Sequence, residues 1–156
     1  MSTLADQSRS SPKQPGRPPA HAFWKMAHKL GTMSESDRIQ SIKAGFNFEM
    51  ANAAKQTFRL TSQNIGTLLN LSVATFERRR KDDKPLDAVA SERLDRIAAI
   101  ALMAEEIFED AAAASEWMAT PNPALNGNSP VMNCETSIGA RQVRRILNAL
   151  EWGGVA

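Results

Sequence analysis

Four consecutive cationic residues, Arg78 to Lys81, form the longest run of positive charge in this sequence of 156 residues. Arginine can donate two hydrogen bonds to guanine in the major groove of DNA, and both arginine and lysine bind phosphate. Successive helical residues point about 100° apart, so these four side chains cannot all face base edges. We therefore expect Thr75 and the first two arginines nearest the bases, and the last two cations on phosphates.

The residues before this run have the spacing of a helix-turn-helix, in which two short helices cross over a tight turn. Gly66 supplies the small residue that the crossing requires, and Asn70, four positions later, tolerates the left-handed conformation of a turn. Ser72 can cap the second helix, which we predict over 73–81. The apolar residues expected to face inward are Ile65, Leu69, Leu71 and Phe76.

This pattern predicts one set of DNA contacts, although a basic helix that is merely solvated remains the alternative. Glu77 could accept a hydrogen bond from cytosine or repel DNA. The residues expected to face DNA are Ser62, Gln63, Ser72, Thr75, Arg78, Arg79, Arg80 and Lys81.

Few other residues have the types and spacing that catalysis or metal binding requires. Cys134 is the single cysteine and has no histidine or basic neighbour in sequence to activate a thiolate, so we expect a small buried residue. His21 and His28 are too few for a zinc site, and the acidic run over 105–110 fits the wet face of a helix. We therefore expect neither an enzyme nor a cofactor or metal site.

The composition, 42% hydrophobic and 23% charged, is typical of a soluble globular chain. No apolar run could span a bilayer and the first 20 residues lack the apolar core of a signal peptide, so we expect a cytoplasmic protein without a membrane partner. The net charge of +2 is unevenly distributed, with +4 over residues 1–33, +2 over 34–90, −4 over 91–115 and zero over 116–156. Such asymmetry indicates faces for different partners.

Helical periodicity dominates the chain, and no alternation typical of strands persists, so we expect an all-α fold. We predict a disordered basic tail over 1–20, a short helix over 21–30 that Gly31 ends, and one or two helices over 34–58. Within the last of these ranges, Ser34 or Ser36 is an expected cap and Gly45 an expected interruption.

A long helix is predicted over 87–114, either as a dimerisation element or as the central strut of the core. Its expected apolar stripe is Val89, Leu94, Ile97, Ala101, Ala104 and Phe108. After a loop over 118–130, Ser129 and Pro130 have the pattern of a helix start, and a final amphipathic helix is predicted over 137–152. The expected organisation is a tail over 1–33, a helix-turn-helix and dimerisation domain over 34–115, and a small C-terminal domain over 116–156.

The C-terminal region has a characteristic order of features: Ala113, Trp117, Pro121-Asn122, Leu125 with Gly127, Pro130, Gly139, Val143, Leu147 and Gly153-Gly154. This pattern resembles the C-terminal domain of the Xre/MbcA/ParS antitoxin family. Upstream, the segments 71–80 and 91–110 resemble the Xre-like helix-turn-helix of the same family. The resemblance covers about residues 40–156. Two departures are the segment 131–134, where the family is more aliphatic, and the paired final glycines, where one is expected.

The resemblance implies the antitoxin of a type II toxin–antitoxin pair. Its partner would be a RES-domain toxin, an enzyme that destroys NAD, and the antitoxin would cover the entrance to the toxin's active site. It would also repress its own operon by binding operator DNA, as a homodimer. A stand-alone helix-turn-helix repressor with a ligand-sensing or dimerising C-terminal half, and an interaction module without DNA binding, are the alternatives.

The C-terminal residues expected to contact the toxin include large, basic and small types. Trp152 is a candidate anchor at the end of the last helix, whereas Trp117 fits core packing. The last four residues could enter a cleft or simply fray. The three arginines of the last helix could meet an acidic surface or only water. The full set is Asn122, Leu125, Arg141, Arg144, Arg145, Glu151, Trp152, Gly153, Gly154, Val155 and Ala156.

Overall fold

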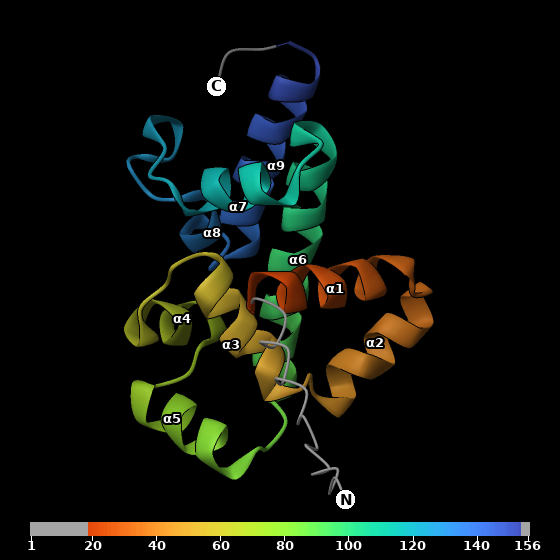
Figure 1. The fold of residues 1–156 in the computed structure, drawn as a ribbon, viewed down its shortest axis with the longest axis vertical. Coiled ribbons are helices and arrows are strands. Elements are labelled where there is room, and N and C mark those ends of the chain that lie inside the picture. The colour runs from red at the N-terminus through yellow and green to blue at the C-terminus, as the bar shows by residue number, and fades with distance from the viewer. Residues whose placement is uncertain (1–18, 154–156) are drawn as a thin grey trace, which may run out of the picture.

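The computed structural model describes residues 19–153, and all regular elements in this range are helices (Figure 1). The predicted all-α fold is therefore confirmed. In chain order the elements are α1 (Pro19–Thr32), α2 (Glu35–Ala44), α3 (Phe48–Thr57), α4 (Ser62–Leu69), α5 (Val73–Asp82), α6 (Ala88–Phe108), α7 (Ala111–Ala119), the 3₁₀ turn η1 (Pro123–Leu125), α8 (Pro130–Asn133) and α9 (Ser137–Glu151).

Short polar side chains define where the helices begin. Each element from α2 to α9 follows a residue whose side-chain oxygen accepts a hydrogen bond from a backbone N–H of the first turn, which satisfies a group that the helix itself leaves unpaired. These caps are Ser34, Asn47, Thr61, Ser72, Asp87, Asp110, Asn122, Ser129 and Thr136. The predicted caps Ser34, Ser72 and Ser129 are confirmed.

Helix α6 is the central strut of the molecule. Helices α1, α2, α4, α7 and α9 all pack on it, and Leu94, Ile97, Ala101 and Ala104 are buried along its length. The structure therefore shows this helix as the strut of the core. Val89, which we placed on the buried stripe, is 49% exposed, because it lies on the outward side of the first turn while Ala90 and Ser91 beside it are buried.

The predicted single helix over 87–114 is wrong in one respect, because it breaks between α6 and α7. Glu109 adopts a left-handed conformation (φ 55°), and the carboxylate of Asp110 accepts a hydrogen bond from Ala113 N and starts α7. This break turns α7 back against α6. The predicted domain boundary between residues 115 and 116 falls inside α7.

Helix α1 is longer than predicted. It runs through Gly31 to Thr32, whose hydroxyl donates a hydrogen bond to the Lys29 carbonyl, so the glycine does not end it. Its inner face packs against α3 and α6, with the Phe23 and Phe58 rings edge to face at 5.0 Å between centroids. The predicted break at Gly45 is confirmed between α2 and α3, with a φ of 94°.

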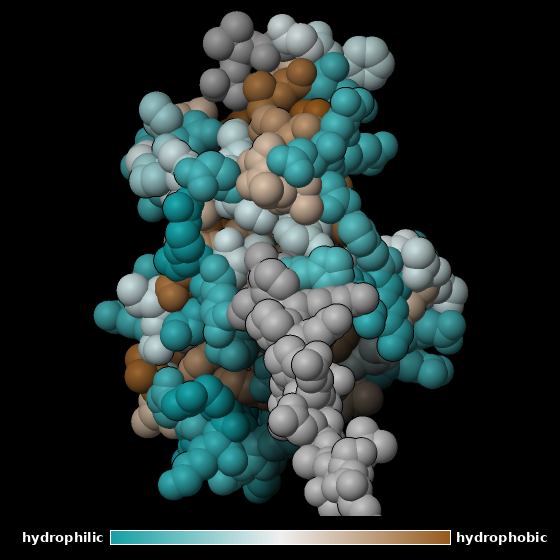
Figure 2. All heavy atoms as spheres, viewed as in Figure 1, coloured by the Kyte–Doolittle hydropathy of each residue, from teal (hydrophilic) through white to brown (hydrophobic). Residues whose placement is uncertain are grey.

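The described helices share one hydrophobic core, which runs from α1 through α6 to α9. Figure 2 shows hydrophilic residues over the end of the molecule that carries α5, and an apolar patch at the opposite end, near the end of α9. No helix between residues 19 and 153 has both the length and the apolarity that crossing a bilayer requires. The predicted tail over 1–20 lies outside the described part of the chain up to residue 18, as do the last three residues, and its final two positions belong instead to α1.

Candidate DNA and partner-protein interfaces

The turn between α4 and α5 has the close approach that the sequence predicts. A Cβ at Gly66 would lie 2.5 Å from the Leu71 carbonyl oxygen, and Leu71 N donates a hydrogen bond to the Gly66 carbonyl over 2.8 Å. Asn70 has the left-handed conformation (φ 58°, ψ 43°). Ser72 then caps α5 by accepting a hydrogen bond from Thr75 N at 3.1 Å. The predicted helix-turn-helix is therefore present.

Packing fixes which side of α5 faces out. Phe76 is buried against Phe48, with ring centroids 4.8 Å apart, and Ile65 and Leu69 of α4 are fully buried. Leu71 is half-buried against the same core. Arg93 of α6 donates a hydrogen bond to the Leu68 carbonyl at 3.3 Å, which holds the end of α4 on the strut. The helix pair is thus a rigid support for the outer residues of α5.

The four cations of α5 have different surroundings. Arg78 and Lys81 are exposed and have no ion pair or hydrogen bond with any described residue. Arg80 donates two hydrogen bonds to the carboxylate of Glu77, at 2.9 and 2.6 Å. Arg79 is half-buried and donates to the Pro85 carbonyl at 2.8 Å, so it lies against the segment between α5 and α6.

These surroundings correct the ranking of the base-contacting residues. In this conformation Arg79 is turned away from the outer face, because Pro85 follows α5 closely and its free carbonyl accepts the guanidinium. Thr75 is half-buried and its hydroxyl accepts a hydrogen bond from Ser72 at 2.8 Å. Arg78 is therefore the arginine of α5 that is free to reach a ligand.

A shallow groove lies between the starts of α4 and α5 and includes Gln63 and Ser72 among its lining residues. Val73, the first residue of α5, also lines it and is 43% exposed. Sequence reasoning missed Val73, although an apolar residue directly after a helix cap is a recognisable signal. An exposed methyl group at this position can contact the methyl group of thymine. Ser62, also expected at this interface, is half-buried.

The C-terminal module holds α9 through backbone contacts. Gly139 lies so close to the preceding turn that a Cβ there would be 1.9 Å from the Asn133 carbonyl oxygen. Thr136 caps α9 by accepting a hydrogen bond from Gly139 N at 2.9 Å. Arg96 of α6 donates to the carbonyls of Cys134 and Glu135, each at 3.2 Å, and so fixes this turn to the strut.

The outer face of α9 is basic. Val143 and Leu147 are buried and Ile146 and Leu150 half-buried, which confirms the predicted apolar face. On the opposite side a shallow hollow is lined by Ile138, Arg141, Arg144, Arg145 and Asn148. None of its three arginines forms an ion pair with a described residue, and Ile138 is 62% exposed. This surface combines uncompensated positive charge with an exposed apolar side chain.

Both regions match known protein domains. Residues 37–99 match the Antitoxin Xre-like helix-turn-helix domain, and residues 103–153 match the Antitoxin Xre/MbcA/ParS C-terminal toxin-binding domain. The chain belongs to the Xre/MbcA/ParS antitoxin family. The two matches meet within α6, so in this antitoxin fold the strut joins the two domains.

Three relatives carry related names. An Antitoxin Xre of Pseudomonas putida is 31% identical over 99 residues, which are 61% of this chain and 62% of that protein. An Antitoxin Xre of Yersinia enterocolitica is 28% identical over 116 residues, 74% of this chain and 78% of the relative. A Prs ADP-ribosylating antitoxin of a Sphingobium species is 27% identical over 132 residues, 79% of this chain and 83% of the relative. The chain thus aligns with less than two thirds of the Pseudomonas protein.

Within the Xre/MbcA/ParS C-terminal domain, the structure separates surface residues from supporting ones. Trp152 is 86% exposed, Glu151 is exposed, and Gly153 continues the chain with a φ of 80°. Trp117 instead packs on the core, with its ring 5.7 Å from that of Phe108, as the core alternative predicted. The expected contacts Gly154, Val155 and Ala156 lie outside the described residues.

Two expected toxin contacts are supporting residues in this structure. Leu125 is only 4% exposed, because η1 folds it into the core, so it cannot touch a partner in this conformation. The side chain of Asn122 accepts a hydrogen bond from Ala124 N at 2.9 Å and its backbone N donates to the Asn128 carbonyl. Leu125 thus belongs to the core, whereas Asn122 caps η1 and is only half-buried.

The single cysteine, Cys134, has the properties of a structural residue rather than a reactive one. Burial raises the pKa of the Cys134 thiol to about 12, although the charge of Arg96 opposes the shift, so the thiol stays protonated and unreactive. The predicted burial of Cys134 is confirmed, and its Sγ donates to the Pro130 carbonyl at 3.3 Å. Among residues 19–153 there is no group of three or more histidine, cysteine or acidic side chains placed to hold a metal ion.

Proposed function

We propose that this chain is the antitoxin of a type II toxin–antitoxin pair, binding its toxin through the C-terminal domain and its operator through α5. It acts in the cytoplasm as a homodimer, represses its own operon and has no catalytic role. The observation that carries this proposal is the basic, partner-free face of α9 within the region that matches a toxin-binding domain.

The toxin contact we propose combines α9 with the residues that follow it. The three arginines of α9 favour an acidic partner surface. They can form ion pairs with such a partner without breaking any ion pair within this chain. Trp152, almost fully exposed, is the kind of large side chain that dominates interface energetics once it is buried by a partner. Arg141, Arg144, Arg145, Glu151 and the segment 152–156 therefore form the proposed contact, without Leu125 and Asn122.

The toxin we propose is a RES-domain enzyme that degrades NAD. The family resemblance supports this partner, and one relative is named a Prs ADP-ribosylating antitoxin. ADP-ribosylation consumes NAD, so the name is compatible with a partner enzyme whose substrate is NAD. The antitoxin would act by covering the entrance to the active site of that enzyme.

The proposed DNA contact centres on Arg78. It is exposed and unpaired at the middle of α5, so it can donate two hydrogen bonds to a guanine without losing a partner. Lys81 lies on a phosphate, and Val73 contacts a thymine methyl group near Gln63 and Ser72. A homodimer would place two copies of α5 about 34 Å apart, one turn of DNA.

Co-expression with the toxin encoded by the neighbouring gene tests toxin binding. Cells should grow with the full chain, but not with a chain that ends at Glu151 or with Arg141, Arg144 and Arg145 all changed to glutamate. Lys43→Glu, a charge reversal at an exposed position of α2, is the matched control and should rescue normally. Full rescue by both altered chains, or failure of the wild type to co-purify with the toxin, would contradict the proposal.

The cellular NAD level tests the identity of the toxin separately. It should fall when the toxin is expressed alone and recover when this chain is co-expressed. A toxin that stops growth at constant NAD, but is still neutralised, would remove the RES assignment and leave the antitoxin role intact.

Operator binding tests the role of α5. Arg78→Ala should cost about 1–3 kcal/mol of binding free energy and relax sequence preference, whereas Lys81→Ala should weaken all sequences similarly and lower the salt dependence. Arg79→Ala should cost less than Arg78→Ala, because Arg79 is engaged with Pro85. Lys43→Ala is again the control. Unchanged affinity of Arg78→Ala would disprove the proposed placement of α5.

A further inference from the structure

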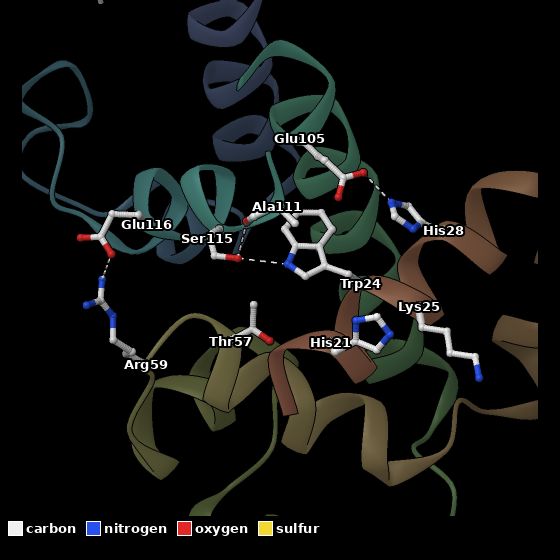
Figure 3. A pocket seen from close by; sticks show the side chains of 11 residues that line it. His21, Trp24, Lys25, His28, Thr57, Arg59, Glu105, Ala111, Ser115 and Glu116 are labelled. Carbon is white, nitrogen blue, oxygen red and sulfur yellow. Dashed lines mark hydrogen bonds and ion pairs between the residues drawn. The ribbon is translucent and has the colours of Figure 1, made fainter. Parts of the chain in front are cut away.

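A cavity of about 790 Å³ lies where α1 meets the end of α3 and the start of α7. Its walls come from both matched domains and from α1, which precedes the residues that either domain model matches. Figure 3 shows Trp24 of α1 pointing across the cavity to Ser115 of α7, with Thr57 of α3 below. The cavity is separate from both proposed interfaces, because α5 and the basic face of α9 contribute no lining residue.

Most polar groups of the cavity wall already have partners. Trp24 Nε1 donates to Ser115 Oγ at 3.1 Å, and Ser115 donates in turn to the Ala111 carbonyl at 2.8 Å. At the two sides, Glu105 pairs with His28 and Glu116 pairs with Arg59 at 2.8 Å. Both carboxylates are thus already engaged by a neighbouring side chain of the wall.

Two polar groups remain without partners. The hydroxyl of Thr57, in a residue only 7% exposed, has no hydrogen-bond partner, a situation that costs free energy unless a ligand or a rearrangement satisfies it. Lys25 also lines the cavity, is exposed, forms no ion pair with a described residue, and extends away from Trp24 and Thr57 (Figure 3). The rim is also formed by the beginning of α1, where the helix dipole is positive and no acidic residue lies in the first turn.

The remaining wall is apolar and consists of Trp24, which is 6% exposed, and of Ala111 and Ala112. A volume of this size and an apolar wall with few polar groups are typical of small-molecule sites. We propose that this cavity binds a small amphipathic anion, whose flat apolar body lies against Trp24 and the alanines of α7. Its anionic group projects at the rim toward Lys25, and the bound molecule touches both domains.

Anilinonaphthalene sulfonate, a flat aromatic anion, is the probe, and N-phenyl naphthylamine, which has the same rings without the charge, is its neutral counterpart. The full chain should bind one equivalent of the anion, and the indole N–H resonance of Trp24 should shift during the titration. Lys25→Met should weaken binding of the anion by about threefold to tenfold and leave the neutral probe unaffected. Lys29→Met, an exposed lysine one turn further along α1 and outside the cavity, should change neither.

A second pair of variants tests the location. Ala112→Phe fills the cavity from an exposed position of α7 and should abolish saturable binding of both probes, whereas Ala149→Phe, equally exposed on α9, should not. Circular dichroism checks that each variant is folded. The proposal is overturned if the folded wild type binds neither probe, if the Trp24 resonance does not shift, or if Lys25→Met and Ala112→Phe bind like the wild type. Should Ala112→Phe not fold, the Lys25 comparison and the Trp24 resonance decide.

Discussion

Replacing Gly66 with alanine tests whether the contact between α4 and the following turn determines the geometry of the helix-turn-helix. The added Cβ would lie 2.5 Å from the Leu71 carbonyl oxygen, whereas ordinary contacts begin near 3.4 Å. Backbone rather than a flexible side chain must therefore move. The turn cannot move away freely, because Leu71 N donates a 2.8 Å hydrogen bond to the carbonyl of the same Gly66.

The size of the effect follows from three contributions. Overpacking of a close contact costs about 1–3 kcal/mol, and weakening the turn hydrogen bond costs about 1 kcal/mol more. The higher helix propensity of alanine offsets about 1 kcal/mol of this cost. We therefore expect Gly66→Ala to lower the free energy of unfolding by about 1–3 kcal/mol and Tm by roughly 2–12 °C.

Gly31→Ala is the matched control. Gly31 is also in a helix, but its Cβ would meet only the Cδ1 atom of Leu102, at 2.8 Å, at the end of a half-buried side chain that can rotate. This variant should be neutral or up to about 1 kcal/mol more stable than the wild type. Urea unfolding followed by circular dichroism measures both variants, and operator affinity of the folded proteins should fall for Gly66→Ala alone. Equal stability of the two variants would refute the reasoning.

Three further predictions concern the residues that hold the fold together. Asp95→Asn should lower the free energy of unfolding, measured in urea, by about 1–2 kcal/mol, because Asp95 accepts two hydrogen bonds from Arg38, at 2.7 and 2.8 Å, while the partly exposed guanidinium can still turn to water. The same pair raises the pKa of Arg38, first through this hydrogen bond. If Glu92→Gln on the same helix costs as much as Asp95→Asn, the prediction is contradicted. Asn70→Ala should cost roughly 1 kcal/mol in the same assay and Asn70→Gly much less, since the left-handed backbone penalises a Cβ; equal effects would argue against that cause. The pKa of Cys134, raised by burial from 9.0 to about 12, makes the unfolded chain lose its thiol proton first, so stability present below pH 9.0 should decline toward pH 12. Cys134→Ala should lack this part of the decline, and identical pH profiles for the two proteins would count against the assignment.

Much of the helical framework can be read from local chemistry. Ser34, Ser72 and Ser129 cap helices because a short hydroxyl side chain reaches the backbone N–H groups of the next turn wherever it precedes a helix. Asn70 and Gly66 specify a tight turn for equally local reasons, namely tolerance of positive φ and the absence of a Cβ. These interactions span at most a few residues, so the sequence alone predicts them.

Tertiary packing decided what local patterns leave open. Arg79 and Leu125 were plausible surface residues by type and spacing, but the path of the chain at Pro85 and the fold of η1 turned both inward. Glu109 breaks a stretch of good helix formers, because a bend there lets α7 pack back on α6.

The cavity between α1, α3 and α7 shows the same division most clearly. Its lining residues come from four helices and one loop, and no sequence period connects Trp24, Thr57 and Ser115. The sequence by itself determined several helix starts, where the turn of the helix-turn-helix lies and which family the chain resembles, because those properties depend on neighbouring residues. Only the tertiary structure decided which cations are free and where a hollow remains, because both depend on residues that are distant in sequence and meet only after folding.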